Sequence, residues 1–124
     1  MNYKDLEIWK LARGLVIDIH KMSLILPKFE IYETGSQIRR SSKSVKSNIV
    51  EGYGRRYYKN EYIKFIVYSL ASNDETIDHL ETLFETESLK DEKLYNDLQN
   101  RSEVLGKMIN IFLTSIINSH KSIK

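Results

Sequence analysis

The stretch QIRRSSKSVKSNIVEGYGRR, residues 37–56, combines two patterns that predict one helix with two different sides. On a helical wheel, small and aliphatic residues share one face; they are Ile38, Ser41, Ser42, Val45, Ile49 and Gly52. Arg39, Lys43 and Lys46 lie beside that face, about 100° away from Ile38. Small side chains let a second helix backbone approach closely, so we expect a tightly packed helix with a basic stripe next to its contact.

The size and composition of the chain indicate one domain. Its 124 residues fit a single compact unit, which we place over residues 1–124. The absence of cysteine excludes disulfides, thiolate nucleophiles and cysteine-ligated metals. Charges interrupt the N-terminal segment MNYKDLEIWK, and no apolar run approaches the length that spans a membrane. We therefore expect a cytoplasmic protein with no membrane partner.

The first helix is predicted from apolar residues at three- and four-residue spacing. Asp5 is expected to cap its start, and Pro27 is expected to end its apolar tail. The segment KFEIYETG, residues 28–35, is then a connection. The expected apolar stripe consists of Leu6, Trp9, Ala12, Leu15, Val16, Ile19 and Met22.

The second helix is the one that contains the opening stretch. Thr34, followed three residues later by Gln37, matches a capping box at a helix start. The helix is expected from about residue 36 to about residue 53. Gly52 and Gly54 near its end suit a C-terminal cap, because glycine adopts the left-handed conformation without a side-chain penalty.

Two more helices complete the prediction. Asn60 is expected to cap the third, which carries Ile63, Ile66, Leu70, Ile77, Leu80 and Phe84. The fourth is expected from about Asp91 to about Ser119, with Leu94, Leu98, Val104, Leu105, Met108, Ile109, Phe112 and Ile116 on its apolar face. Short connections between long helices favour antiparallel neighbours. We therefore predict an all-α, antiparallel up-and-down four-helix bundle.

Charge is distributed unevenly along the chain. Residues 37–64 contain eight Lys or Arg and two acids, whereas residues 65–99 contain two Lys or Arg and nine acids. Tyr57 and other tyrosines alternate with Arg55, Arg56 and Lys59, which places flat rings beside cations. This combination is typical of surfaces that bind nucleic-acid backbones and stack bases.

Two other interpretations of the basic stretch remain open. A run of lysine and arginine on an exposed helix is often only a solvated face. The cations could also dock the acidic helices of a neighbouring subunit, which would make the protein an interaction scaffold without nucleic-acid binding. Apolar residues outside the stripes would then cover a contact; they are Tyr3, Phe29, Ile31 and Tyr32.

The segments DLEIWKLA (5–12), SQIRRSSKSVKSNIVEGYGR (36–55) and EYIKFIVYSLASNDETIDHLETL (61–83) resemble a known family. It comprises four-helix-bundle proteins encoded in intervening sequences of bacterial large-subunit ribosomal RNA genes. Related to it is the accessory variability protein of diversity-generating retroelements, a reverse-transcriptase partner. The sequence departs from the family pattern at Lys46, where proline is common after the aliphatic residue Val45.

The resemblance implies an assembly and a set of partners. Members form barrel-like homopentamers with a positively charged nucleic-acid-binding surface. It therefore implies a homo-oligomeric barrel that binds RNA or DNA and presents it to a partner, such as a reverse transcriptase or a ribosomal component.

The motif residues divide into two groups by their chemistry. Asn48, Glu51, Gly52 and Gly54 are assigned to structure or subunit contacts, because Glu51 would repel phosphate and buried polar groups need partners. The phosphate-binding candidates are cations and one stacking ring: Arg39, Arg40, Lys43, Lys46, Arg55, Arg56, Lys59 and Tyr57.

Two arrangements were weighed as catalytic or metal sites. Arg13 and His20, seven residues apart on one helix face, weakly resemble the arginine and histidine pair of helical ribonucleases. Glu75, Asp78 and His79 could ligate a metal, but the paired glutamate and histidine spacing of di-iron bundles is absent. We therefore predict a non-enzymatic protein without a cofactor or metal, and keep a ribonuclease that uses Arg13 and His20 as a remote alternative.

Overall fold

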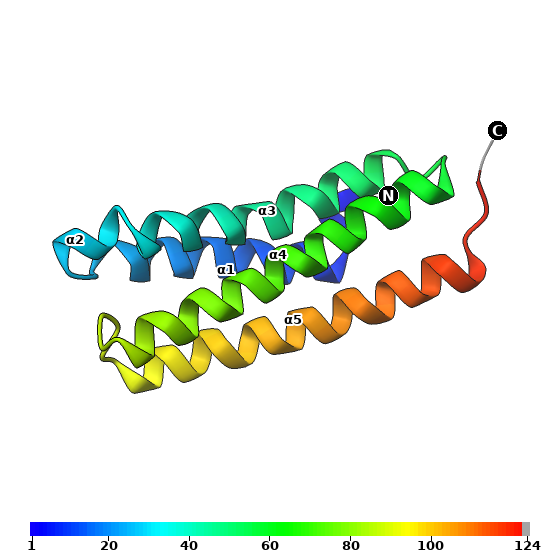
Figure 1. The fold of residues 1–124 in the computed structure, drawn as a ribbon. Helices are drawn as coiled ribbons and strands as arrows, with labels where there is room; N and C mark the ends of the chain where they lie inside the picture. The colour runs from blue at the N-terminus through cyan, green and yellow to red at the C-terminus, as the bar shows by residue number, and fades with distance from the viewer. Residues whose placement is uncertain (123–124) are drawn as a thin grey trace.

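The computed structural model describes residues 1–122, which form four long helices and two short ones (Figure 1). In chain order they are η1 (Tyr3–Asp5), α1 (Glu7–Leu24), α2 (Lys28–Ile31), α3 (Thr34–Gly54), α4 (Lys59–Glu85) and α5 (Glu92–Ser119). This part of the chain contains no strand, so the predicted all-α class is confirmed. The segment expected as a connection contains the short helix α2.

The four long helices lie alongside one another (Figure 1). Helix α3 packs on α1 and α4, and α5 packs on α4 and, less extensively, on α1. Ser41, Ser44 and Val45 on α3 contact Thr76, Ser72 and Ser69 on α4. The partner's residue number falls along α4 as the number rises along α3, which is the order that a short connection between neighbouring helices imposes.

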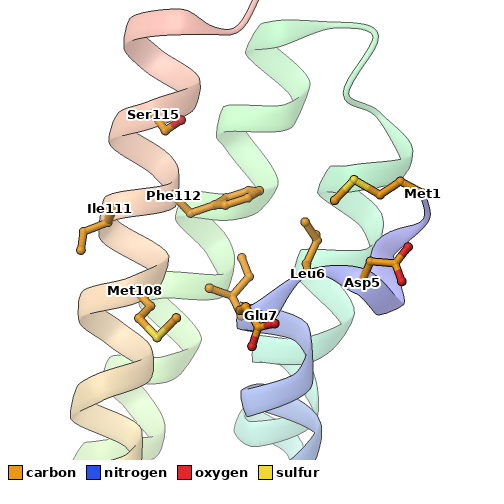
Figure 2. Close-up of a pocket in the computed structure, with 9 residues that line it drawn as sticks. Met1, Asp5, Leu6, Glu7, Met108, Ile111, Phe112 and Ser115 are labelled. Atoms are coloured by element: carbon orange, nitrogen blue, oxygen red, sulfur yellow. The ribbon is translucent and has the colours of Figure 1, made fainter.

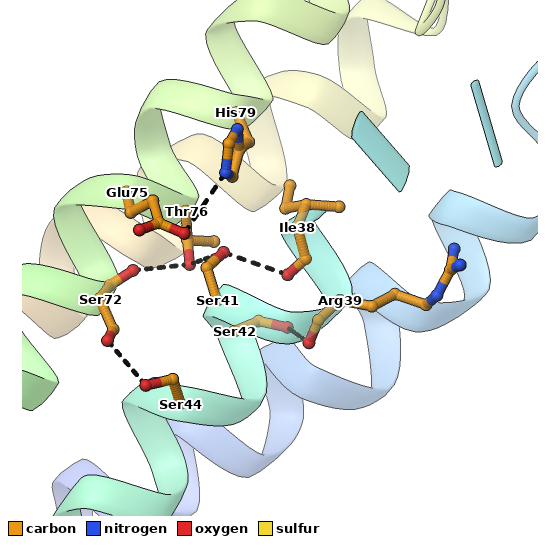
Figure 3. A network of polar contacts seen from close by, with 9 residues as sticks. All are labelled: Ile38, Arg39, Ser41, Ser42, Ser44, Ser72, Glu75, Thr76 and His79. Atoms are coloured by element: carbon orange, nitrogen blue, oxygen red, sulfur yellow. Dashed lines mark hydrogen bonds and ion pairs between the residues drawn. The ribbon is translucent and has the colours of Figure 1, made fainter. Parts of the chain in front are cut away.

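The contact between α3 and α4 rests on small residues, as the opening stretch predicts. The buried residues of α3 include the whole predicted face, from Ile38 to Gly52. Hydroxyl groups join the two helices across it: Ser41 and Thr76 lie 2.8 Å apart (Figure 3). The Ser69 hydroxyl donates to the Val45 carbonyl at 2.7 Å. At Gly52, an added Cβ would lie 3.2 Å from side-chain carbons of Phe65 and Ile66.

The buried side of α4 differs from the predicted one. Of the six expected positions only Ile66 and Leu80 are fully buried. The observed row is Tyr62, Ile66, Ser69, Asn73, Thr76, Leu80 and Leu83. Polar residues are tolerated there because they find partners: the Asn73 amide donates to the Ser102 carbonyl at 2.9 Å. The prediction from apolar residues alone therefore placed the buried side of α4 part of a turn away from its observed position.

Three predicted helix starts were wrong. Asp5 belongs to η1, where its carboxylate accepts from the Asn2 backbone, and Leu6 takes the N-cap position before α1 instead. Thr34 forms no capping box, because the Glu30 carboxylate accepts its backbone N–H at 3.0 Å. Asn60 lies inside α4, which begins one residue earlier. At α1 and α4 the cap positions are instead occupied by Leu6 and Tyr58, whose side chains make no cap hydrogen bond.

Two further helix boundaries, the start of α5 and the end of α3, had different outcomes. Asp91 does cap α5, and its carboxylate accepts from the Leu94 backbone at 3.0 Å. At the end of α3, no glycine in the described chain adopts a positive φ, so Gly52 and Gly54 do not form the expected left-handed cap. Gly52 instead provides space for α4, while Gly54 faces open space.

The substitution Gly52→Val tests the close approach of α3 and α4. The added methyl groups would overlap Phe65 and Ile66, so the free energy of unfolding in urea should fall by about 1–3 kcal/mol. Gly54→Val is the matched control, because nothing lies within 4 Å of its Cβ position; it should change stability by less than about 0.5 kcal/mol. Equal effects of the two substitutions would contradict the packing role of Gly52.

Candidate nucleic-acid interface

Arg39, the first of the predicted phosphate ligands, is tied into the fold. It is half-buried, and one guanidinium nitrogen donates to the Ser23 hydroxyl at 2.8 Å while another donates to the Ile31 carbonyl at 2.9 Å. The side chain thus joins α3 to the end of α1 and to α2. Two of the five N–H donors of its guanidinium are therefore used within the protein.

Arg40, Lys43 and Lys46 differ from Arg39 in their surroundings. Arg40 and Lys43 are exposed and Lys46 is half-buried. None of the three makes an ion pair or side-chain hydrogen bond with another residue of the described chain, 1–122. Their charges are therefore available to an external anion.

Helix α1 adds a further cation beside this stripe. Arg13, Val16, His20 and Ser23 recur at helical spacing and so share one side of α1, the side on which Ser23 meets Arg39. On α3, Lys43, Lys46 and Val50 continue the row that starts at Arg39. The two rows run along the same seam, which brings Arg13 to the side of α3 that carries Lys46.

The resulting cationic surface contains no acid within its two rows. Helix α3 has no acid before Glu51, which pairs with Arg55, and Asp18 of α1 is held by Arg101 of α5 at 2.8 Å. We call Arg13 of the α1 row, Lys43 and Lys46 of the α3 row, and Arg40, which is exposed beside the α3 row, the α1–α3 basic face. Sequence analysis missed Arg13 as part of it, because the pairing of α1 with α3 is a tertiary feature.

The remaining predicted ligands gather at the end of the bundle where α3 ends and α4 begins. Arg55 is 3.0 Å from Glu61 and 3.7 Å from Glu51, so its charge is largely balanced. The Lys59 ammonium donates to the Ile117 carbonyl at 2.8 Å and thereby joins the ends of α4 and α5. Tyr57 is exposed, and the Arg56 guanidinium lies 5.0 Å from the centre of its ring.

Two of the motif residues, Asn48 and Glu51, contact residues of their own helix. The Asn48 amide donates to the carbonyl and the hydroxyl of Ser44. Glu51 is exposed and lies one turn before Arg55.

The two alternative sites lie on α1 and α4. Arg13 and His20 are both exposed on α1. Glu75 lies 3.5 Å from His79, as Figure 3 shows, and within residues 1–122 no group of three or more His, Asp or Glu side chains converges on a common point. At this position the structure has one contact between a carboxylate and an imidazole.

An apolar groove lies between η1 and the start of α1 on one side and α5 on the other. Its cavity has a volume of about 450 Å³, and Figure 2 shows Leu6, Met108 and Phe112 facing this space from two sides. A smaller hollow further along is lined by Leu11, Leu15 and Val104. Val104 was expected in the core but is 50% exposed, because α1 and α5 do not close over it.

Comparison with known proteins identifies the family. The model of the 23S rRNA-intervening sequence protein family matches residues 4–111. The chain belongs to this family. The predicted resemblance is therefore confirmed. None of the curated proteins matches the chain.

A solved structure shares the fold of this 23S rRNA-intervening sequence protein family member. It is the crystal structure of a protein of unknown function from the S23 ribosomal protein family of Bacteroides thetaiotaomicron. The TM-score is 0.77 at 21% sequence identity, over 86% of this chain and 95% of that chain. Within residues 1–122, each helix of the family member is too short or too polar to cross a membrane.

Adjacent arginines of this family member give a direct test of the site assignment. Arg39→Ala removes two hydrogen bonds between helices and should lower the free energy of unfolding by about 1–3 kcal/mol. Arg40→Ala removes an exposed side chain and should change it by less than about 0.5 kcal/mol. Urea unfolding of the two variants measures the difference, and equal stability would show that Arg39 is not an anchor.

Proposed function

We propose that this protein binds the phosphate backbone of RNA or DNA through the α1–α3 basic face. The observation that supports this most strongly is that Arg13, Lys43 and Lys46 lie in two rows without acids, with Arg40 exposed beside them. Cations spaced along two parallel rows match the repeating charge of a nucleic-acid strand. Their neutralisation of phosphates would release counterions, which makes binding strongly dependent on salt.

Binding of this kind selects weakly for sequence. Lysine and arginine on an open helical surface contact phosphate oxygens, which are the same in every nucleotide. The protein would therefore bind many strands and leave sequence selection to another component.

The proposed function contains no chemical step. Arg13 and His20 are seven residues apart, which separates them by about 10 Å along the axis of α1. A general base must lie within hydrogen-bond reach of the proton that it abstracts, together with the groups that stabilise charge. The ribonuclease alternative would need additional groups at each of these two positions. We instead propose an accessory role, in which the protein presents nucleic acid to a partner such as a reverse transcriptase or a ribosomal component.

A triple substitution of Arg40, Lys43 and Lys46 by glutamine tests the proposed surface. It leaves out Arg39, whose loss would disturb the fold. The affinity for single-stranded RNA should fall, and the slope of log K against log salt should decrease by about 2 to 3, because three phosphate contacts are lost. Fluorescence anisotropy across a salt series measures both quantities.

The matched control replaces Lys90, Lys93 and Lys107 by glutamine. All three are exposed; Lys90 lies two residues before α5, and Lys93 and Lys107 lie on it. The net charge changes by the same amount as in the first triple variant. The control should bind nearly as well as the unmodified protein. If both triple variants lose affinity equally, only the overall charge matters and the proposed face is not a site.

A second proposal concerns assembly. It is supported by the apolar groove between η1 and the start of α1 on one side and α5 on the other, which we call the α1–α5 groove. Leu11, Val104 and Ile111 are exposed beside it at 38%, 50% and 69%. Of the residues expected to cover a contact, Phe29 and Tyr32 are also exposed. We propose that a second copy of the chain covers the groove in a homo-oligomer, for which family resemblance implies a pentameric barrel.

The substitution Ile111→Glu tests the groove as a contact between copies. Light scattering after size-exclusion chromatography should show a shift from oligomer to smaller species, whereas Thr114→Glu, on the same helix and also exposed, should leave the mass unchanged. An oligomer that persists in Ile111→Glu contradicts the proposed contact. An oligomer that dissociates in high salt instead supports the scaffold alternative, in which basic and acidic helices dock.

A further inference from the structure

A second cavity lies at the end of the bundle, next to the groove of Figure 2. It has a volume of about 380 Å³, within the usual range of small-molecule sites. Its lining combines rings, hydroxyls and one guanidinium: Tyr53, Arg56, Tyr62, Phe112, Ser115 and Ser119, with His120 at the same end. We call it the end pocket.

The aromatic lining of the end pocket is held in place by ring contacts. Tyr62 is only 4% exposed and packs edge-on against Tyr53, Phe112 and His120, with ring centres 6.4, 6.0 and 5.1 Å away. Burial, together with Tyr53, raises the pKa of Tyr62 to about 12 although Arg56 acts in the opposite direction. The Tyr62 hydroxyl is thus neutral at physiological pH. Within residues 1–122 it makes no side-chain hydrogen bond, so it can donate to a ligand.

The Arg56 guanidinium in the end pocket is held by ring contacts, and only some of its N–H donors make hydrogen bonds. The Arg56 guanidinium stacks 4.2 Å from the Tyr53 ring centre and 5.0 Å from that of Tyr57. One of its nitrogens donates to the Tyr53 carbonyl at 2.9 Å, which leaves donors on the other edge. The His120 Nε2 lies 2.7 Å from the Arg56 carbonyl, so this nitrogen donates and Nδ1 is left for another partner.

We infer that the end pocket binds a nucleotide that carries a terminal phosphate, either free or at the end of a nucleic-acid strand. A flat base matches the half-buried rings of Tyr53 and Phe112, and a phosphate monoester matches a guanidinium edge with neighbouring hydroxyls. Ser115 and Ser119 are exposed and make no side-chain hydrogen bond within residues 1–122, so both hydroxyls can donate to the phosphate.

The position of the end pocket connects it to the α1–α3 basic face. Lys46 and Tyr53 are seven residues apart on α3, which is about 10 Å along the helix axis. A strand whose last nucleotide occupies the pocket therefore continues past Val50 towards Lys46 and Lys43. Only the strand-end form of the inference rests on the proposed function, because a free nucleotide does not need the basic face.

The test compares four ligands by NMR titration and anisotropy: AMP, adenosine, a linear single strand with a terminal phosphate, and a circular single strand of similar composition. AMP should shift the amide signals of Tyr53, Tyr62 and His120, and adenosine should bind more weakly. Ser119→Glu, an exposed substitution that places a negative charge at the pocket, should weaken AMP binding about tenfold or more. Tyr62→Phe, which keeps the ring, should weaken it by a smaller factor, and Lys107→Gln is the control outside the pocket.

The outcomes separate the two sources of the nucleotide and the two proposals. Preference for the linear over the circular strand, lost in Ser119→Glu, supports a strand end as the ligand. If the linear and circular strands bind equally and AMP still shifts the pocket signals, the results support a free nucleotide as the ligand. Binding of AMP without binding of either strand would refute the proposed function and leave the pocket standing. The inference is overturned if AMP shifts none of the pocket signals, or if Ser119→Glu leaves its affinity unchanged.

Discussion

The close contact between α3 and α4 is the constraint on which the rest of the structure depends. Ser41 and Thr76 share a hydrogen bond of 2.8 Å, Ser69 donates to the backbone at Val45, and Gly52 leaves room for Ile66. No long side chain fits on this side of α3. Every lysine and arginine of the helix must therefore lie towards α1 or towards solvent, and the buried hydroxyls must find partners across the contact because unpaired polar groups are destabilising.

This constraint explains how a chain with a net charge of only +2 carries a distinctly basic side. The cations of α3 are directed to the α1 seam, where Arg13 adds to them. The acids Asp74, Glu75 and Asp78 belong to α4, on the other side of the α3–α4 contact. The separation of basic and acidic residues in space thus follows from a packing requirement. The basic side is available to bind an anionic strand or an oppositely charged neighbour. The end pocket lies where the basic row of α3 ends, so the two sites can serve one strand.

The sequence predicted some of these features well, and the reasons differ from residue to residue. The buried face of α3 was predicted correctly because it is the only side of the helix without long side chains. The buried side of α4 was not, since Asn73 and Thr76 resemble surface residues until Ser102 and Ser41 are known to lie opposite them. Arg39 and Arg40 look equivalent in the sequence, and only the positions of Ser23 and Ile31 distinguish an anchor from an exposed cation. The end pocket joins residues from positions 53 to 120, so no local pattern could have indicated it.

The central claim is that nucleic acid lies on the α1–α3 basic face, and lysine footprinting tests it most directly. The purified protein is labelled with an amine-reactive reagent in low salt, with and without single-stranded RNA, and each lysine is quantified by mass spectrometry. The account predicts that RNA protects Lys43 and Lys46 while Lys93 and Lys107 are labelled as before. Unchanged labelling of Lys43 and Lys46 in a complex that has formed, or protection of Lys93 and Lys107 instead, would contradict it.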